Sequence, residues 1–518
     1  MLLARKSWYT QSSMSSTPLA MKKYIFALIF AAGAIFPVSA SAASCVFTSD
    51  LKSGSKGAQV TNLQAFLKSQ GYFSAKSVPN FGPATLAAVK KFQKANGISQ
   101  TGTAGPLTRA KIKAICAGSG STVSSAISTD GITPTDAPTT FEVTGWIPYW
   151  RQATGTADTL PHLSKLTEVN PFVFTLKSDG TLLDNGPLET EPWASFNLIA
   201  KQMGVRVIPT VMTSNAEMLH QILSNAESRQ ALEDNIANMV IAKGYDGIDI
   251  DFEGKSANTK DYFSTFLKGL KQRLGTKWLM CTIETRIPNE DKYYGTDIPA
   301  DAGLFANDLK AIGTYCDRVR LMTYDQQGID LKLSAEAGTR LYAANGDPAW
   351  IEKVVNLMSK DIPRSKILLG VPTYGYEYSV TTYEGGQHLY DILWTFNPGY
   401  AAPQKGVSQQ SLAEKYGITP ERTYWGELAF TYVPTGTATS TVSMGSGMSA
   451  QAAAAAATTY ANTYHSNMTY RYVVWPDEVS TLQKIELAKR LGVRGISVFK
   501  FDGGQDPDIW NALTGAKK

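Results

Sequence analysis

From residue 141 onward, short apolar segments of strand length alternate with stretches whose apolar residues recur at helical spacing. We expect eight strands, at 143–149, 172–176, 205–212, 247–253, 278–284, 318–324, 367–374 and 495–501. Strands that alternate with helices form parallel sheets, and this number of strands favours a closed barrel. The sequence therefore predicts an α/β fold, a (β/α)8 TIM barrel over 141–518, with a doubly wound open sheet as the alternative.

A long insertion, about 375–485, separates the seventh expected strand from the eighth. Within it, 425–433 and 470–474 have the pattern of strands, and the alanine-rich stretch 450–461 has that of a helix. The segment 434–447 is rich in Ser, Thr and Gly, and we expect a loop without chemistry there. We therefore expect a small α+β insertion between strands 7 and 8 of the barrel.

The segment 43–117 follows a purely helical pattern and differs from the rest of the chain. Its apolar residues form two stripes and a third short stretch: Val60, Leu63 and Leu67; Leu86, Val89 and Phe92; and 108–115. This pattern predicts a small three-helix domain with a marginal core. The following segment, 118–140, is rich in Ser, Thr, Gly, Ala and Pro and predicts a flexible linker.

The N-terminal pattern is typical of export. Met21-Lys22-Lys23 precedes an apolar run at 24–36, and Ala40-Ser41-Ala42 supplies small residues for cleavage. We expect a secretory signal peptide at 21–42 and a non-structural extension at 1–20, with Met1 or Met21 as the start. An uncleaved membrane anchor is the alternative; after cleavage we expect a secreted or cell-envelope protein without membrane association.

Composition adds few constraints. The chain has 518 residues and a net charge of +5, which fits a soluble multidomain protein and does not suggest nucleic-acid binding. The modest positive charge would allow weak attraction to an acidic polymer such as a cell wall, and solubility explains it equally well. No pattern fixes the oligomeric state, and we take the chain as a monomer.

Export changes the interpretation of the four cysteines. Cys45 and Cys116 bracket the helical module, and we expect them to form a disulfide worth roughly 4 kcal/mol in the chain-entropy model. Cys281 and Cys316 lie near the starts of two consecutive expected strands. The sequence leaves open whether these two pair or remain buried thiols.

The candidate chemistry lies on the fourth expected strand. Side chains alternate across a strand, so Asp249, Asp251 and Glu253 share one face. Carboxyl groups this close cannot all ionise cheaply, so at least one pKa should rise, as an acid catalyst of glycoside cleavage requires. A cation site or a merely polar strand face are the alternatives on spacing alone.

The same stretch resembles a known signature. Asp246-Gly247-Ile248-Asp249-Ile250-Asp251-Phe252-Glu253 resembles the Asp-Gly-x-Asp-x-Asp-x-Glu signature of glycoside hydrolase family 18. Supporting segments occur in the family's order: Met322-Thr323-Tyr324-Asp325, then 366–375, 495–497 and 502–507. The resemblance covers most of 141–518 and implies a barrel that hydrolyses glycans carrying a 2-acetamido sugar.

The resemblance also implies catalytic roles. Glu253 would protonate the glycosidic oxygen, and the substrate's own acetamido group would act as nucleophile. Asp251 would accept the acetamido N–H, and Asp249 would share a proton with Asp251 and tune the acidity of Glu253. Tyr324 and Asp325 would bind the acetamido group. No metal or organic cofactor is implied.

Further substrate-binding candidates are weaker: Asp246, Tyr149, Trp150, Trp475 and Phe499, with Glu284 as an additional acidic candidate. We expect Asp246 to be mainly structural, and Tyr149, Trp150 and Trp475 to line a sugar cleft. Most active relatives carry a tryptophan on the eighth strand as the floor under the sugar, where our alignment places Phe499. A phenylalanine offers less stacking area and no N–H donor; a shifted alignment would bring Phe501 or Trp510 there instead.

The helical module resembles the peptidoglycan-binding domain of wall hydrolases. The resemblance rests on 51–57, Val60, Leu63-Gln64, Leu67, Gly71-Tyr72, Phe81-Gly82, Thr85, Ala88-Val89, Phe92-Gln93, Gly97 and 102–108. Together the two resemblances imply a polysaccharide substrate, most simply peptidoglycan cleaved after N-acetylglucosamine. A chitinase and a glycan-binding barrel without activity are the alternatives, and a structural spacer is the alternative for the module.

Overall fold

The structure is a computed structural model that describes residues 50–96, 98, 100–105, 108, 109, 111, 112, 115, 140–434 and 448–516. Several expected features lie outside the described residues: the extension 1–20, the signal peptide 21–42, the Cys45–Cys116 disulfide, and the linker 118–140 except for its last residue. In the insertion, residues 435–447 of the expected loop also lie outside them.

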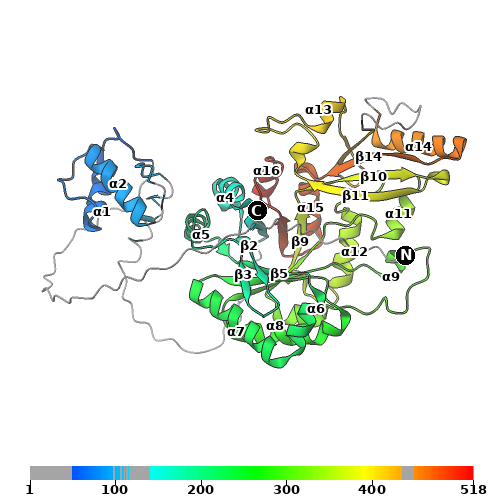
Figure 1. Ribbon diagram of the computed structural model, residues 1–518, viewed down its shortest axis with the longest axis horizontal. Helices are drawn as coiled ribbons and strands as arrows, with labels where there is room; N and C mark the ends of the chain where they lie inside the picture. The colour runs from blue at the N-terminus through cyan, green and yellow to red at the C-terminus, as the bar shows by residue number, and fades with distance from the viewer. Residues whose placement is uncertain are drawn as a thin grey trace, which may run out of the picture. The chain divides into compact units, whose positions relative to one another are not determined.

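Eight parallel strands form a closed barrel, because β1 (Glu142–Pro148) pairs with both β15 (Gly495–Phe499) and β2 (Glu168–Leu176). The remaining strands are β5 (Thr210–Thr213), β6 (Gly247–Phe252), β7 (Trp278–Ile283), β8 (Arg318–Leu321) and β9 (Ile367–Pro372). The predicted barrel is therefore confirmed, and the open sheet is excluded (Figure 1).

Helices cover the outside of the barrel: α4 (Gln152–Thr159), α5 (Trp193–Gln202), α6 (Ala216–Ser224), α7 (Ala226–Lys243), α8 (Lys260–Leu274), α10 (Leu309–Tyr315), α12 (Pro348–Met358), α15 (Glu478–Arg490) and α16 (Ile509–Thr514). Shorter elements are β3 (Leu182–Asp184), α9 (Asn289–Lys292) and α11 (Leu331–Ala337). The apolar faces of strands and helices meet in one core that includes Ile248, Ile250 and Phe252 of β6. Because strand side chains alternate, the other face of β6 points into the barrel.

The third expected strand, 205–212, is broken in the structure. It forms β4 (Arg206–Val207) and β5 (Thr210–Thr213), with Pro209 between them. Proline has no backbone N–H and cannot donate to a neighbouring strand. The carbonyl oxygen of Pro209 still accepts the N–H of Asp249 at 2.8 Å, which fixes the register of β6.

Charged residues gather at the N-terminal ends of the barrel strands. Glu142, only 3% exposed, pairs with Arg206 at 3.3 Å, Arg318 at 2.8 Å and Arg494 at 2.9 Å. Side chains inside such barrels are more often bulky and apolar. Here one carboxylate joins β1 to β4, to β8 and to the residue before β15, so the start of the barrel is held by electrostatic pairing.

The insertion is a five-stranded antiparallel sheet in the order β11-β10-β14-β13-β12. Its elements are β10 (Gly375–Thr382), β11 (His388–Phe396), α13 (Leu412–Tyr416), β12 (Glu421–Arg422), β13 (Leu428–Tyr432), α14 (Ala450–Tyr464) and β14 (Met468–Trp475). Helix α14 contacts β10, β13 and β14 (Figure 1). The expected α+β insertion is confirmed.

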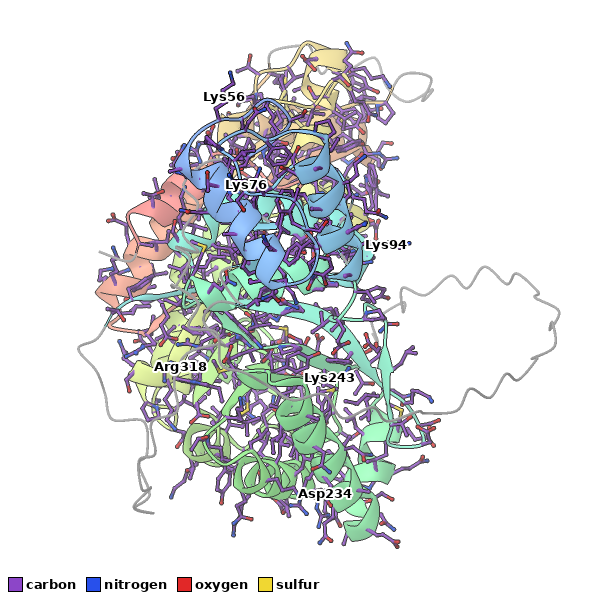
Figure 2. The ribbon with its side chains drawn as sticks, turned by 90° about the vertical axis from the view of Figure 1, so that its left-hand side faces the viewer. Lys56, Lys76, Lys94, Asp234, Lys243 and Arg318 are labelled. Carbon is purple, nitrogen blue, oxygen red and sulfur yellow. A yellow bond between two sulfur atoms is a disulfide. The ribbon has the colours of Figure 1, made fainter. Side chains whose placement is uncertain are left out.

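The N-terminal module contains α1 (Ala58–Ser69) and α2 (Pro83–Ala95), and the described residues between 108 and 115 are also helical. Val60, Leu63 and Phe92 are buried in its small core. Gln64 lies in this core and donates from Nε2 to the hydroxyl of Thr85 at 2.8 Å. Its surface carries exposed lysines: Lys56, Lys76 and Lys94 (Figure 2).

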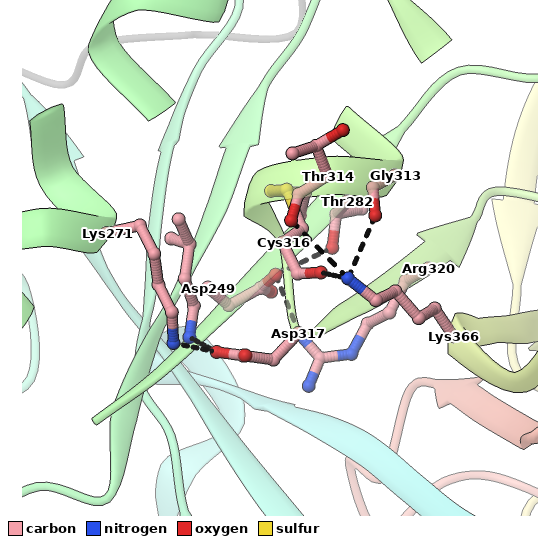
Figure 3. The surroundings of a disulfide bond; sticks show 11 residues. Asp249, Lys271, Thr282, Gly313, Thr314, Cys316, Asp317, Arg320 and Lys366 are labelled. Carbon is pink, nitrogen blue, oxygen red and sulfur yellow. Dashed lines mark hydrogen bonds and ion pairs between the residues drawn. A yellow bond between two sulfur atoms is a disulfide. The ribbon is translucent and has the colours of Figure 1, made fainter. Parts of the chain in front are cut away.

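The open question about the second cysteine pair is resolved. Cys281 on β7 and Cys316 after α10 form a buried disulfide with their Cα atoms 6.0 Å apart (Figure 3). The bond spans 35 residues of sequence, which corresponds to roughly 4 kcal/mol in the chain-entropy model. Lys366 donates to the carbonyl of Cys316 at 2.9 Å and so ties the bridge to the chain that leads into β9.

Replacing Glu142 by glutamine should destabilise the barrel by about 3 kcal/mol at neutral pH, because three partly buried arginines lose their carboxylate. Burial alone would raise the pKa of Glu142, but the Arg318 hydrogen bond and the charges of Arg206, Arg318 and Arg494 lower it. This stabilisation is complete above the unfolded-state pKa of about 4.3 and is lost as the pH falls through the lower folded-state pKa.

Calorimetry at neutral and acid pH checks this prediction. Glu142→Gln should melt well below the wild type at pH 7, and the difference should shrink towards about pH 3. Glu486→Gln, on the exposed surface of α15, is the matched control and should melt like the wild type. Equal melting temperatures for Glu142→Gln and the wild type at pH 7 would contradict the electrostatic role.

Candidate active site

Strand β6 carries the three predicted carboxyl groups to one end of the barrel. Asp249 is fully buried and Asp251 is 5% exposed, both on the inward face of the strand. Glu253 follows directly after β6, and its N–H donates to the carbonyl of Thr213 at 2.8 Å. The sequence pattern therefore places a column of carboxyl groups at the C-terminal end of the barrel, the usual position of active sites in this fold.

Asp249 is surrounded by donors from four other strands. One oxygen accepts from Trp146 Nε1 at 3.1 Å and the Thr210 hydroxyl at 2.9 Å. The other accepts from the Thr282 hydroxyl at 2.9 Å and lies 2.7 Å from Nη1 of Arg320 (Figure 3). Donors on both oxygens and a guanidinium beside them favour an ionised carboxylate. We infer that Asp249 is the charged member of the column.

Asp251 has the opposite environment. Burial raises the pKa of Asp251 well above its usual range, and the charges of Glu253, Asp249 and Glu284 raise it further. Within the described part of the chain, its buried Oδ1 accepts no hydrogen bond. A neutral carboxyl group with an unused acceptor is suited to receive an N–H from a ligand.

Glu284 and Lys255 hold the turn after Glu253. Glu284 was only an additional acidic candidate from the sequence, and Lys255 was not predicted. Gly254, at φ +64°, donates to Glu284 Oε1 at 2.7 Å. The ammonium group of Lys255 is buried and lies 3.8 Å from Glu284 Oε2. Burial lowers the pKa of Lys255 despite the carboxylates around it. These contacts fix the backbone on which Glu253 stands; no motif identified Lys255.

Asp325 lies in the loop after β8 and not on a strand. Its backbone has φ +58°, and its N–H donates to Oδ1 of Asn345 at 2.9 Å. The hydroxyls of Tyr374 and Tyr376 both donate to its carboxylate. Tyr376 belongs to the insertion, so the insertion takes part in organising the site, which the sequence did not indicate.

Aromatic rings meet above the carboxyl column. Phe499 stacks on Tyr324 with centroids 5.7 Å apart, and its edge contacts Trp146 at 5.7 Å and Phe172 at 6.2 Å. Tyr324 is buried, and burial raises its pKa well above the usual value, so the phenol remains a donor. Phe499 is the last residue of β15, and its role as the floor under the sugar stays a prediction.

The two aromatic residues considered as replacements for Phe499 lie elsewhere. Phe501 is fully buried and stacks on Trp510 with centroids 4.6 Å apart, within the outer core of the barrel. An added Cβ on Gly145 would collide with the Phe501 ring, which shows how closely this core is packed. Neither Phe501 nor Trp510 contacts the Phe499 ring.

The remaining aromatic candidates differ in exposure. Trp150 is 51% exposed, and its ring contacts Tyr149 at 5.0 Å and Phe172 at 5.9 Å. Trp475 is 2% exposed and packs against aromatic rings of the insertion, among them Phe430. Trp150 therefore has surface available for a sugar, whereas the burial of Trp475 argues for a packing role.

Asp246 lies at the other end of β6 from Glu253. Its Oδ2 accepts the N–H of Val207 at 2.7 Å, which joins β4 to the start of β6. This contact suits the structural role that we expected and leaves Asp246 away from the aromatic rings. In the part of the chain that the structure describes, no cluster of His, Cys, Asp and Glu has a metal-binding arrangement.

Comparison with known families matches two parts of the chain. The family described as "Glycosyl hydrolases family 18" matches residues 145–504, more than half of the chain. The family described as "Putative peptidoglycan binding domain" matches residues 56–112. The first match contains the carboxyl column and the insertion, and the second contains α1 and α2.

Two similar curated proteins come from Bacillus species. The chain is 21% identical over 344 residues to "Uncharacterized glycosylase YvbX" of Bacillus subtilis (strain 168), covering 66% of this chain and 81% of that protein. It is 24% identical over 356 residues to the "Cortical fragment-lytic enzyme" of Bacillus anthracis, covering 67% of each.

Solved structures show the same fold. The Bacillus cereus spore cortex-lytic enzyme SleL aligns with a TM-score of 0.51 and 20% identity, over 74% of this chain and 76% of that chain. A chitinase from Chromobacterium violaceum ATCC 12472 aligns with a TM-score of 0.52 and 17% identity, over 73% of this chain and 98% of that chain. At these identities the likeness concerns the fold alone.

Among the helices of the described residues, none combines the length and the apolar composition needed to cross a membrane.

The raised pKa of Asp251 predicts a stability that falls as the pH rises. Above the unfolded-state pKa of about 3.9, the unfolded chain releases a proton that the folded barrel keeps, so folding becomes less favourable up to the folded-state pKa. Asp251→Asn removes this effect. Its melting temperature should exceed that of the wild type by roughly 2 °C or more at pH 7, and less at pH 4.

Asp249→Asn is the matched comparison, because it makes the same exchange one inward position earlier on β6. It takes the carboxylate from buried Arg320 and should destabilise the barrel by about 3–5 kcal/mol. Melting curves for both variants between about pH 4 and 8 check the assignment. Similar destabilisation by both variants at pH 7 would contradict a neutral Asp251 beside a charged Asp249.

Proposed function

Because the chain belongs to glycosyl hydrolase family 18, we propose that it is an exported enzyme that cleaves the β-1,4 bond after N-acetylglucosamine in peptidoglycan. The chain is a glycoside hydrolase with a peptidoglycan-binding domain. The observation that carries the proposal is the order of carboxyl groups along β6: Asp249 lies 2.7 Å from Arg320, and buried Asp251, whose Oδ1 lacks a hydrogen-bond partner within the described chain, stands two positions before Glu253.

In the first step, Glu253 gives its proton to the glycosidic oxygen while the bond from that oxygen to the anomeric carbon breaks. The carbonyl oxygen of the 2-acetamido group attacks the anomeric carbon from the other face and forms a cyclic cation. This substrate-assisted route needs no carboxylate nucleophile from the protein. It also requires a sugar with an acetamido group at the cleaved bond, as peptidoglycan and chitin have.

Asp251 orients that acetamido group. Its Oδ1 accepts the acetamido N–H, which turns the carbonyl oxygen towards the anomeric carbon and stabilises the cation. The proton on Asp251 can hydrogen-bond to the Glu253 carboxylate that the first step produces. Burial keeps the phenol of Tyr324 protonated, so its hydroxyl donates a hydrogen bond to the acetamido oxygen.

In the second step, the Glu253 carboxylate takes a proton from water as that water attacks the anomeric carbon. The ring of the cyclic cation opens, the configuration is retained and Glu253 regains its proton. Phe499 provides an apolar face beneath the sugar, and Trp150 offers an exposed ring nearby. Tyr374 and Tyr376 donate hydrogen bonds to the carboxylate of Asp325 and hold it in place to bind the acetamido group.

We favour peptidoglycan over chitin as the substrate because of the N-terminal module. A domain that binds the wall would hold the catalytic barrel at a high local concentration of its substrate. Two of the similar proteins are named for lysis of spore cortex or its fragments, which agrees with a wall glycan. Action at the cell envelope or outside the cell follows from such a substrate.

Digestion of purified sacculi and of chitin, followed by product analysis, tests substrate and catalyst together. The wild type should release muropeptides with N-acetylglucosamine at the reducing end. Glu253→Gln should lower turnover on the order of 10²-fold or more, because glutamine cannot supply the proton. Glu290→Gln on exposed α9 makes the same chemical exchange and should leave turnover unchanged.

Each other outcome favours a different function. Chito-oligosaccharides without muropeptides would make the enzyme a chitinase. Binding of sacculi with no turnover by wild type or variant would identify a glycan-binding barrel. Unchanged turnover in Glu253→Gln would remove Glu253 as the acid.

A further inference from the structure

Arg320 is the one fully buried arginine among the described residues. It lies on β8, points into the barrel and is 2.7 Å from Oδ1 of Asp249. It also pairs with Glu168 of β2, and its guanidinium carbon lies 5.2 Å from the centre of the Trp146 ring. A buried charge persists only where its partners offset the loss of hydration, so these partners define what Arg320 does.

We propose that Arg320 is a positioning residue that keeps Asp249 as a carboxylate, so that Asp251 and Glu253 alone hold the exchangeable protons of the site. The proposal rests on the proposed function and refines it. We expected Asp249 and Asp251 to share a proton. The contacts of Asp249 instead separate the column into one fixed anion and two groups that titrate.

The acceptor capacity of Asp249 carries the argument. A carboxylate has about four acceptor positions, and here Trp146, Thr210 and Thr282 donate hydrogen bonds while Arg320 supplies the counter-charge. A proton on either oxygen would replace one of these donors or face the guanidinium. Trp146 and Arg320 have no acceptor with which to receive it.

Arg320 is available to Asp249 because its other partner is already neutralised. Glu168 lies 3.1 Å from Nε of Arg206, so it has its own counter-charge from β4. The other charged or titratable groups around the column are Asp251, Glu253, Lys255, Glu284, Tyr324 and Asp325. All of them lie at or beyond the end of β6, towards the aromatic rings. From β1, β5 and β7, Asp249 receives only the neutral donors Trp146, Thr210 and Thr282.

The arrangement has a consequence for proton balance. The proton that leaves Glu253 goes to the glycosidic oxygen, and it returns to Glu253 from the attacking water. Asp251 keeps its proton throughout and offers it as a hydrogen bond to the Glu253 carboxylate. Asp249 neither gains nor loses a proton, and its fixed charge adds to the burial of Asp251, which is the main reason that Asp251 stays neutral.

The experiment compares Arg320 variants of the full chain by two independent readouts. The first is the carboxyl signal of 13C-labelled aspartate, assigned with Asp249→Asn and Asp251→Asn. The second is the pH profile of kcat/KM with sacculi as substrate. Arg318→Gln is the matched control, because Arg318 lies two positions earlier on the same inward face and pairs with Glu142.

Across about pH 5 to 8, the wild-type Asp249 signal should stay that of a carboxylate, and the Asp251 signal should remain that of a carboxylic acid to higher pH than in an ordinary aspartate. In Arg320→Gln, Asp249 should take up a proton in this range. Both limbs of the pH profile should move down by about one unit, because a protonated Asp249 no longer places a negative charge beside Asp251 and Glu253. Arg320→Lys should restore most of the wild-type behaviour, and Arg318→Gln should keep it.

If Arg320→Gln does not fold, Arg320→Gln/Glu168→Gln removes one charge of each sign and should give the same shift. A protonated Asp249 in the wild type, or a profile unchanged by loss of Arg320, would overturn the proposal. A wild type without hydrolysis would overturn the proposed function alone, since the carboxyl signals still report on Arg320.

Discussion

The ion pair between Arg320 and Asp249 is the interaction on which the account of the site depends. Both groups are fully buried inside the barrel, where an unpaired charge would be strongly unfavourable. The pair continues a series of charges that begins with Glu142 and its arginines and passes through Glu168. Each of these buried charges has an opposite charge beside it. No charge is therefore left for Asp251 to offset, and Asp251 can be neutral. Glu253, which we propose as the acid, follows directly after β6.

Sequence periodicity was sufficient to predict the barrel and the strand that carries this site. The alternation of Asp249, Asp251 and Glu253 with Ile250 and Phe252 predicted an inward carboxyl column, and the strand pattern predicted the barrel. Periodicity did not identify Arg320, because the alternation of Arg318, Val319 and Arg320 fits a solvated strand equally well. The donors Trp146, Thr210 and Thr282 depend on the register between strands, which has no local signature. Pro209 was visible in the sequence, but we predicted one continuous strand through it.

The insertion shows a second limit of pattern reading. Its strands and its alanine-rich helix were predictable, yet the first of these strands supplies Tyr376, whose hydroxyl donates to Asp325. A tyrosine on a strand carries no indication of what it faces. Trp475 illustrates the converse, since a large aromatic residue near a sugar site was buried inside the insertion. Burial and partner geometry, and not residue type, separated Trp150 from Trp475.

The central claim concerns where one proton resides, and neutron diffraction from deuterated crystals of the full chain would locate it directly. The account predicts a deuteron on the carboxyl group of Asp251 and none on Asp249, with deuterons of Trp146, Thr210 and Thr282 directed at the Asp249 oxygens. A deuteron on Asp249, or one shared between Asp249 and Asp251, would contradict it.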